Sequence, residues 1–139
     1  MASDYLGTYD PLEVTLNVGT LAVTGFADGE FITCARVDPD LYKNHTGAYG
    51  ETSRAKNNNK TGTIVFTLKS TSPSNAKLDL MKLNPVTMPI IVKNNSTRKH
   101  IAVCTEGWIN KEPNKVYGAE ETMIEWEIFC SDLIMSHLE

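Results

Sequence analysis

The heptapeptide Thr63-Ile64-Val65-Phe66-Thr67-Leu68-Lys69 alternates large apolar residues with residues that are mostly polar. Successive side chains of a β-strand point to opposite faces of the sheet, so a period of two predicts a strand. One face of this strand is entirely apolar, whereas the other carries Thr63, Thr67 and Lys69 together with one valine. Such a strand is typical of an antiparallel sheet that packs one side on a hydrophobic core and exposes the other.

The same period recurs on both sides of this strand. In the last long segment, Ile124, Trp126 and Ile128 face one way, and Glu125 and Glu127 face the other. Strands are therefore expected in a hairpin at 14–23, at 31–37, in a hairpin at 88–105 with its turn at 94–97, and at 123–130.

One helix is predicted, at residues 72–82. Ser72 can cap its N-terminus, and Leu83-Asn84-Pro85 ends it. Leu78 and Met81 recur at helical spacing, so this face is expected to pack on the sheet. The elements together predict a mainly β fold: an antiparallel β-sandwich or barrel-like sheet with one flanking α-helix.

A long polar segment, 38–62, separates two of the strands. Loops of this length without structure of their own are uncommon and usually functional, although residues 49–55 could continue a strand. Its tip is predicted at 54–60, which holds basic side chains and an asparagine run and no acid: Arg54, Lys56, Asn57, Asn58, Asn59 and Lys60. A solvated hairpin tip and an arm that binds another subunit are both compatible with this composition.

Length and composition limit the possible classes of protein. The 139 residues, with a formal net charge of -4, predict a single domain, 1–139, that does not bind nucleic acid tightly, because phosphates require a cationic surface. No apolar run is long enough to span a membrane. The first five residues lack the pattern of a secretory signal, and three widely spaced cysteines, an odd number, are expected to be apolar strand residues of an intracellular protein.

The sequence contains no recognisable catalytic or metal-binding constellation. His45, His100 and His137 belong to no zinc motif, and there is no nucleophile elbow or phosphate-binding glycine loop. Acidic turns at 28–30 and 38–40 are explained by turn chemistry alone. We therefore expect no enzyme activity, no metal and no cofactor.

An open sheet leaves unpaired backbone groups at its edges, and pairing between subunits is one way to satisfy them. The edges are predicted at 31–37 and 123–130. The basic 54–60 segment and the acidic Glu120-Glu121 and Glu125 to Glu127 segment favour head-to-tail association, which builds rings or stacked filaments. The alternative is that these charges only keep a monomer soluble.

Several stretches together resemble a known family. They are Tyr9-Asp10-Pro11, the strand and turn at 14–19, the turn at 24–29, the segment from Gly47 to Asn59, and the strand that leads into Thr71-Ser72-Pro73-Ser74-Asn75. Their order resembles the tail-tube proteins of contractile-tailed bacteriophages. The resemblance covers residues 9–82 clearly and continues as pattern from residue 85 to the end; related inner tubes occur in secretion systems and contractile bacteriocins.

The resemblance implies how the protein functions. Six copies form a ring, rings stack into a tube, and each copy lends strands to an inner barrel through which phage DNA passes. The partners implied are other copies of the chain, the tail sheath, the baseplate and the tape-measure protein, with no specific DNA binding and no membrane insertion. The location implied is the virion tail, assembled in the host cytoplasm.

Under this hypothesis, polar residues opposite the apolar strand positions line the bore. Carboxylates repel DNA and lysines would retain it, so the lumen-lining residues expected are Glu125, Glu127, Thr63, Thr67 and, in addition, Glu51. Lys69 is compatible with such a bore only if it lies at a strand end or forms an ion pair. The 38–62 segment is then an assembly arm, and residues 132–139 are a strand end, an inter-ring contact or a tail.

A different class of protein, a monomeric β-sandwich that binds a sugar or another surface ligand, is the competing hypothesis. Trp108, Tyr117 and Tyr42 could supply its aromatic platform. Single exposed aromatic residues are common, and Trp108 is equally compatible with a core position.

Overall fold

The computed structural model describes residues 7–83, 87–95 and 99–137. Its elements are a 3-10 turn (Pro11–Glu13), β1 (Val14–Val18), β2 (Leu21–Ala22), β3 (Ile32–Arg36), β4 (Tyr42–Thr46), β5 (Thr52–Lys56), β6 (Gly62–Lys69), α1 (Ser74–Leu83), β7 (Met88–Asn94), β8 (His100–Ile109), β9 (Met123–Cys130) and β10 (Leu133–His137). The predicted helix stop at Asn84 and Pro85, the last two residues of the turn at 94–97 and the last two residues of the 132–139 segment lie outside the described residues.

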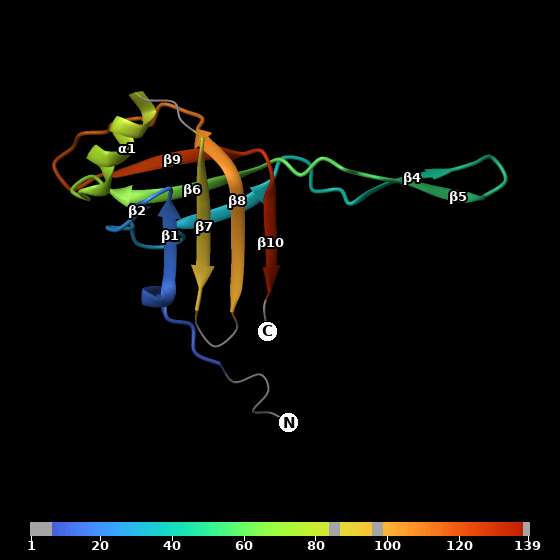
Figure 1. Cartoon of the computed structure of the whole chain (residues 1–139), viewed down its shortest axis with the longest axis horizontal. Helices are drawn as coiled ribbons and strands as arrows, with labels where there is room; N and C mark the ends of the chain where they lie inside the picture. Colours follow the sequence, from blue (N-terminus) through green and yellow to red (C-terminus); the bar gives the residue numbers. More distant parts are fainter. Residues whose placement is uncertain (1–6, 84–86, 96–98, 138–139) are drawn as a thin grey trace.

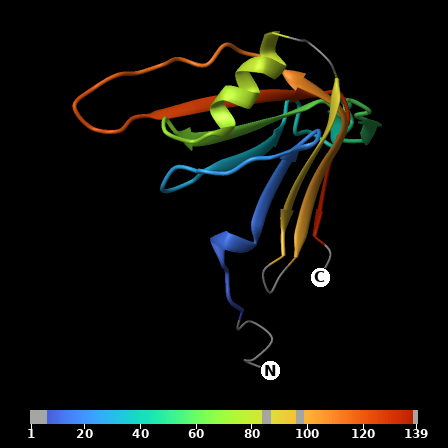
Figure 2. The ribbon, with the colours of Figure 1, turned by 60° about the vertical axis from the view of Figure 1, so that its left-hand side comes forward.

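The main sheet is antiparallel and runs in the order β2-β1-β7-β8-β9-β6-β3, with β10 also paired to β8. Figures 1 and 2 show that it is strongly bent, so that β1, β7, β8 and β10 form one layer and β9, β6 and β3 cross it as a second layer. This arrangement confirms the predicted mainly β sandwich with one helix. The hairpins at 14–23 and 88–105 and the strands at 31–37 and 123–130 are confirmed to within a few residues.

Strand β8 belongs to both layers. Its first half pairs with β10, from His100↔His137 to Cys104↔Leu133, and its last three residues pair with β9. The register with β7 slips by one residue between Ile90↔Cys104 and Met88↔Gly107, as a β-bulge requires. The backbone carbonyl of Glu106, inside the bulge, accepts hydrogen bonds from the amide and the hydroxyl of Ser131, so the bend is fixed by the β9–β10 turn.

Segment 123–130 was predicted to be an edge strand, and this prediction is wrong. β9 is interior, because β6 pairs along its whole length and the end of β8 pairs with its other side. The prediction for 31–37 is right, since β3 is the last strand in the order of the main sheet.

The core fills the angle between the two layers and is closed by α1. Ser72 caps the helix by accepting a hydrogen bond from the amide of Ser74, and Leu78 of the helix is fully buried. Trp126 of β9, only 1% exposed, donates its indole N–H to Asn75 of α1 at 3.0 Å. The core cluster contains Leu16, Val18, Leu21, Val23, Ile64, Phe66, Leu68, Leu78, Ile90, Val92, Ala102, Cys104, Ile124, Trp126, Ile128, Cys130 and Leu133.

Gly25 is required where the chain passes the helix N-terminus. Its φ of 78° suits glycine, and a Cβ there would lie 2.6 Å from the Cβ and Oγ of Ser72, the cap that also donates to Thr24. We expect Gly25→Ala to lower the free energy of unfolding by about 2 kcal/mol, because it adds backbone strain and displaces the cap. Urea denaturation measures this loss.

Gly29→Ala is the matched control for this substitution. Gly29 has a similar φ of 86° but no atom within 4 Å of an added Cβ, so the variant should lose about 1 kcal/mol from strain alone. Equal losses in the two variants would show that the contact with Ser72 is unimportant.

Candidate functional site

The outward face of the β6–β9 pair carries most of the predicted lumen-lining residues. Thr67 lies opposite Glu125 across the pair, and Glu127 lies two residues further along the same face of β9. Thr63 lies on the same face of β6, opposite Phe129. The other face of these strands holds the buried core and α1, so the polar face is turned away from the helix.

The carboxylates on this face differ in their environment. Glu125 is exposed, whereas the side chain of Glu127 is only 20% exposed. Its Oε2 accepts a hydrogen bond from Asn110 at 3.2 Å and lies 3.6 Å from the ammonium group of Lys111. No local pattern predicts Lys111 as its counterion, because Lys111 lies in the loop that follows β8 and Glu127 lies in β9. Lys69 is the last residue of β6, which agrees with the expectation that a lysine on this face lies at a strand end.

Glu51 does not join the other predicted lumen residues. It lies at the tip of a separate two-stranded hairpin, β4–β5, that projects from the bent sheet between β3 and β6 (Figure 1). The tip turn is closed by two hydrogen bonds, from the amide of Gly47 to the carbonyl of Glu51 at 2.7 Å and from the amide of Gly50 to the carbonyl of Gly47 at 3.1 Å. We call residues 38–61, including this hairpin, the arm.

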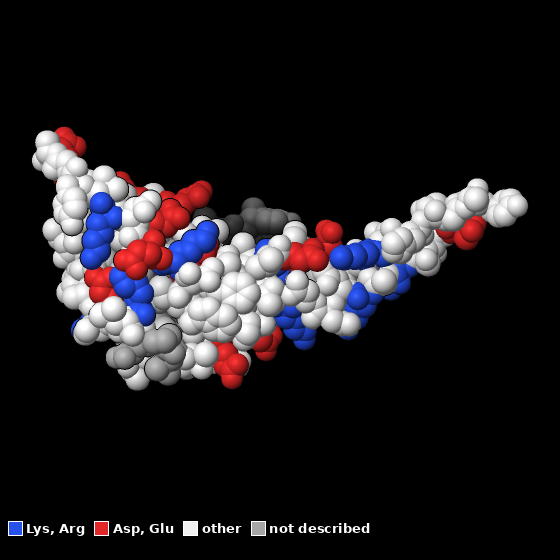
Figure 3. All heavy atoms as spheres, turned by 90° about the horizontal axis from the view of Figure 1, so that it is seen from above, with Lys and Arg blue, Asp and Glu red and all other residues white. Residues whose placement is uncertain are grey.

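The predicted position of the arm tip, 54–60, is wrong. Arg54 and Lys56 lie in strand β5, and the tip is the glycine-containing turn between Thr46 and Thr52. All ten residues of β4 and β5 are exposed. Arg54 covers the ring of Tyr42 at 4.2 Å, a cation–π contact across the hairpin. In Figure 3, blue basic side chains follow the arm, which carries Lys43 as well as Arg54 and Lys56.

The asparagine run forms the base of the arm. Asn57 donates its side-chain amide to the carbonyl of Asp40 at 2.7 Å, and Asn59 accepts from both the amide and the hydroxyl of Thr61. The carbonyl of Lys60 accepts from the guanidinium of Arg36 and from the amide of Leu133 in β10. Lys60 therefore anchors the arm to the main sheet, and Asn57 and Asn59 hold the base of the arm together, with Asn58 between them.

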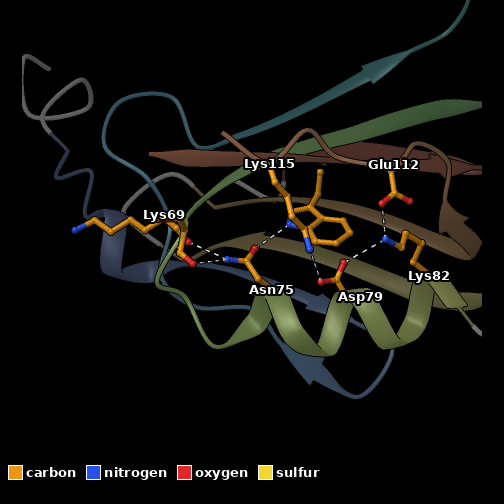
Figure 4. Close-up of polar contacts among 8 residues, drawn as sticks. Lys69, Asn75, Asp79, Lys82, Glu112 and Lys115 are labelled. Carbon is orange, nitrogen blue, oxygen red and sulfur yellow. Dashed lines mark hydrogen bonds and ion pairs between the residues drawn. The ribbon is translucent and has the colours of Figure 1, made fainter. Parts of the chain in front are cut away.

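A long loop, 110–122, is held against the helix by charged contacts (Figure 4). Asp79 of α1 lies 3.3 Å from Lys115 and 3.4 Å from Lys82, and Lys82 also lies 2.7 Å from Glu112. The hydrogen bond from Lys82 to Glu112 raises the pKa of the lysine. Glu112 and Lys115 are exposed, and Asp79 and Lys82 are only partly buried. These surface ion pairs therefore position the loop without adding much to stability.

The remaining candidate residues are scattered. The free cysteines Cys34, Cys104 and Cys130 lie in strands, as predicted, and burial raises the pKa of Cys34 to about 11. Within the described ranges, no group of three or more His, Cys, Asp or Glu residues is arranged to hold a metal ion. No helix in the described part of the chain is both long and apolar enough to cross a membrane.

The predicted aromatic platform is not assembled by any contact among the described residues. Trp108 of β8 is partly buried against Phe129, with ring centroids 5.3 Å apart. Tyr117 is exposed on the 110–122 loop, and Tyr42 lies under Arg54 on the arm. Three aromatic rings on three separate elements do not form one binding surface.

Comparison with known proteins supports one family. The family model described as "Bacteriophage PhiTE tail tube protein" matches residues 18–136. No curated protein sequence matches the chain.

Solved structures share the fold at low sequence identity. The sheath/tube terminator of the extracellular contractile injection system PVC has a TM-score of 0.65 and 9% identity, covering 95% of this chain and 99% of that one. A chain of the PVC sheath-tube complex has a TM-score of 0.61 and 11% identity, with coverages of 99% and 95%. The tube-terminating cap of the anti-feeding prophage has a TM-score of 0.59 and 8% identity, with coverages of 94% and 91%.

Proposed function

Because the chain belongs to the phage tail-tube family, we propose that its copies form hexameric rings that stack into the inner tube of a contractile tail, through which phage DNA passes. The family is one of structural tube proteins, and the chain acts without catalysis or cofactor. The observation that carries the proposal is the family match over 18–136, joined to a sheet whose outward face is polar. Negative-stain microscopy of the purified protein should show rings or tubes; a stable monomer at high concentration would contradict it.

The outward face of β6 and β9 lines the bore in this proposal. Glu125 supplies an exposed negative charge, and Thr63 and Thr67 supply neutral polar surface that does not hold phosphates. Glu127 contributes a charge that Lys111 partly balances. Glu51, on the arm, belongs to assembly contacts instead of the bore. Since α1 covers the other side of the sheet, the helix faces the outside of the tube, where the sheath lies.

The arm completes the assembly by reaching a neighbouring copy in the same ring or the next ring. A lone two-stranded hairpin is marginally stable in water, so one that is exposed on both faces is explained by a partner that covers it. Its basic side chains suit an acidic surface of another copy.

Reversing the charge of the bore should slow DNA passage. In Glu125→Lys/Glu127→Lys tubes, every ring presents lysines to the phosphates, and we expect DNA release at low salt to slow by at least about tenfold, with the defect shrinking as salt rises. Particles complemented with the variant are triggered in vitro, and release is followed with a DNA-binding dye.

The matched control is Glu120→Lys/Glu121→Lys, which changes the net charge equally on the loop beside α1. Its tubes should assemble like the wild type and release DNA at the wild-type rate. If both double variants release DNA normally, Glu125 and Glu127 do not line the bore.

A tube in a contractile injection system, or in a bacteriocin, is the second candidate function. It is favoured by the fold shared with the tube and terminator chains of the PVC and anti-feeding prophage systems. A baseplate and a length-setting protein would be its further partners in either machine. Purifying intact particles and testing them for packaged DNA distinguishes the two candidates.

A further inference from the structure

The two layers of the sheet diverge at the end opposite α1 and leave an open groove of roughly 600 Å³ between them. One wall is β3 with the preceding turn, and the other is formed by β7, β8 and β10. The lining is mainly apolar and includes Phe31, Ile32, Val92, Ala102 and Met135. Grooves of this size and character accommodate an aromatic anchor from a partner.

Polar groups lie among this apolar lining. They include His100 and His137, directly paired across β8 and β10 with ring centroids 5.1 Å apart, and Ser136. Among the described residues that line the groove, Glu30 is the only acidic residue, and there is no lysine or arginine. The Nε2 of His100 already lies 3.0 Å from the side-chain nitrogen of Asn94, so Ser136 and His137 are the nearer candidates to pair with a ligand. A buried tyrosine hydroxyl needs such hydrogen-bond partners.

The arm tip presents a matching side chain. Tyr49 is 97% exposed, the highest exposure among the large hydrophobic side chains that the structure describes. It lies in the turn closed by the Gly47 and Gly50 amides, and Gly50 has a φ of 87° that fixes the turn. A tyrosine held on a short ordered turn loses little conformational entropy when it binds. Figure 1 shows the arm extending away from both layers, so the tip cannot reach its own groove.

Charge favours contact between these two parts of different copies. The first 35 residues contain five acidic residues and no lysine or arginine, and they provide the Tyr9 and Gly29 to Cys34 part of the groove lining. The hairpin from Tyr42 to Lys56 carries Lys43, Arg54 and Lys56 against a single acid, Glu51 in its turn. Opposite charges on the two surfaces steer association and disfavour contact between two arms or two grooves.

We propose that the arm tip of one copy inserts Tyr49 into the groove between the two layers of a second copy. The inference rests on the proposed tube assembly and names the surface that receives the arm. The tyrosine ring packs against the apolar lining, its hydroxyl bonds to the polar groups between the strands, and the basic arm strands lie along the acidic N-terminal segment of the receiving copy.

Cysteine cross-linking tests this contact because Cys34 already lines the groove. Tyr49→Cys/Cys34→Ser protein is mixed with wild-type protein, assembled, and oxidised with copper–phenanthroline. A covalent dimer that reductant reverses is expected on a denaturing gel. Thr46→Cys/Cys34→Ser, with its cysteine below the tip, should give at least about tenfold less dimer.

A second measurement keeps the aromatic ring in place. Tyr49 is replaced by p-benzoylphenylalanine, and irradiated tubes that mix isotope-labelled and unlabelled copies are analysed by mass spectrometry. Attachment to the peptide around Met135 or to the β3 peptide of the other isotope supports the contact. Attachment only to the 110–122 loop, to α1 or to the same copy overturns it.

The outcomes separate this inference from the tube proposal. If tubes form but neither probe reaches the groove, the docking surface is wrong and the tube stands. If the wild-type protein forms no tubes or rings, both fail. Where the contact holds, Tyr49→Ala should raise the critical concentration for tube growth at least about tenfold, and Tyr49→Phe should raise it less.

Discussion

Tubes should be absent from a variant in which residues 42–56 are replaced by an Asn-Gly turn. The amide of Asn57 bonds to the carbonyl of Leu41, so these two residues are already paired and a two-residue turn can join them. The folded body should keep its stability, because every residue of β4 and β5 is exposed and none belongs to the core. Tube growth is followed by light scattering and microscopy, and folding by circular dichroism and urea denaturation.

Ser53→Ala is the control for this deletion, because it changes an exposed arm residue and keeps the hairpin. It should assemble like the wild type. An armless protein that still forms tubes would show that the arm has no part in assembly. Removing 57–60 is a poorer test, since Lys60 accepts hydrogen bonds from Arg36 and Leu133 of the main sheet and its loss would disturb the fold of the body.

Trp126→Ala should produce the largest loss of stability, about 3–5 kcal/mol in the free energy of unfolding. The side chain is 1% exposed and joins β9 to α1, so its removal leaves a cavity between the helix and both layers. It also leaves the carbonyl of Asn75 without the indole donor. Since small domains have only about 5–15 kcal/mol in total, the variant should be partly unfolded at 37 °C.

Trp108→Ala is the matched control for Trp126→Ala. Trp108 is only partly buried, against Phe129, and its indole makes no hydrogen bond with the residues that the structure describes, so the loss should be about 1 kcal/mol. Urea denaturation of both variants measures the difference. Similar losses would mean that the core is not centred on Trp126.

The strands were predictable because each carries its own two-sided pattern. The buried face of β6 is indicated by Ile64, Phe66 and Leu68. That of β9 is indicated in the same way by Ile124, Trp126 and Ile128. The residues of a strand do not indicate which other strands pair with it. β9 was predicted at an edge because its pairing with the end of β8 depends on the bulge near Glu106, which no periodicity reveals.

The arm shows a different limit of sequence reasoning. The tip was predicted near Arg54 and Lys56 because basic residues are concentrated there. Backbone geometry decides where a hairpin turns, and Gly47 and Gly50 were the residues that indicated the turn. β10 was one of three open possibilities for its segment, because only Leu133 of the strand is buried. The pairing of Glu127 with Lys111, and the groove between the layers, arise from distant segments and had no local signature.

The arm lies in the chain where it can be exchanged between related tube proteins. Its two ends are neighbours, since Arg36 and Gly62 are register partners and the amide of Val37 bonds to the carbonyl of Thr61. The arm is thus a contiguous cassette inserted into one β-hairpin, and exchanging it leaves every core residue untouched. Transplanting it between related proteins, together with the groove that receives it, would create orthogonal sets of subunits that polymerise only with their own kind.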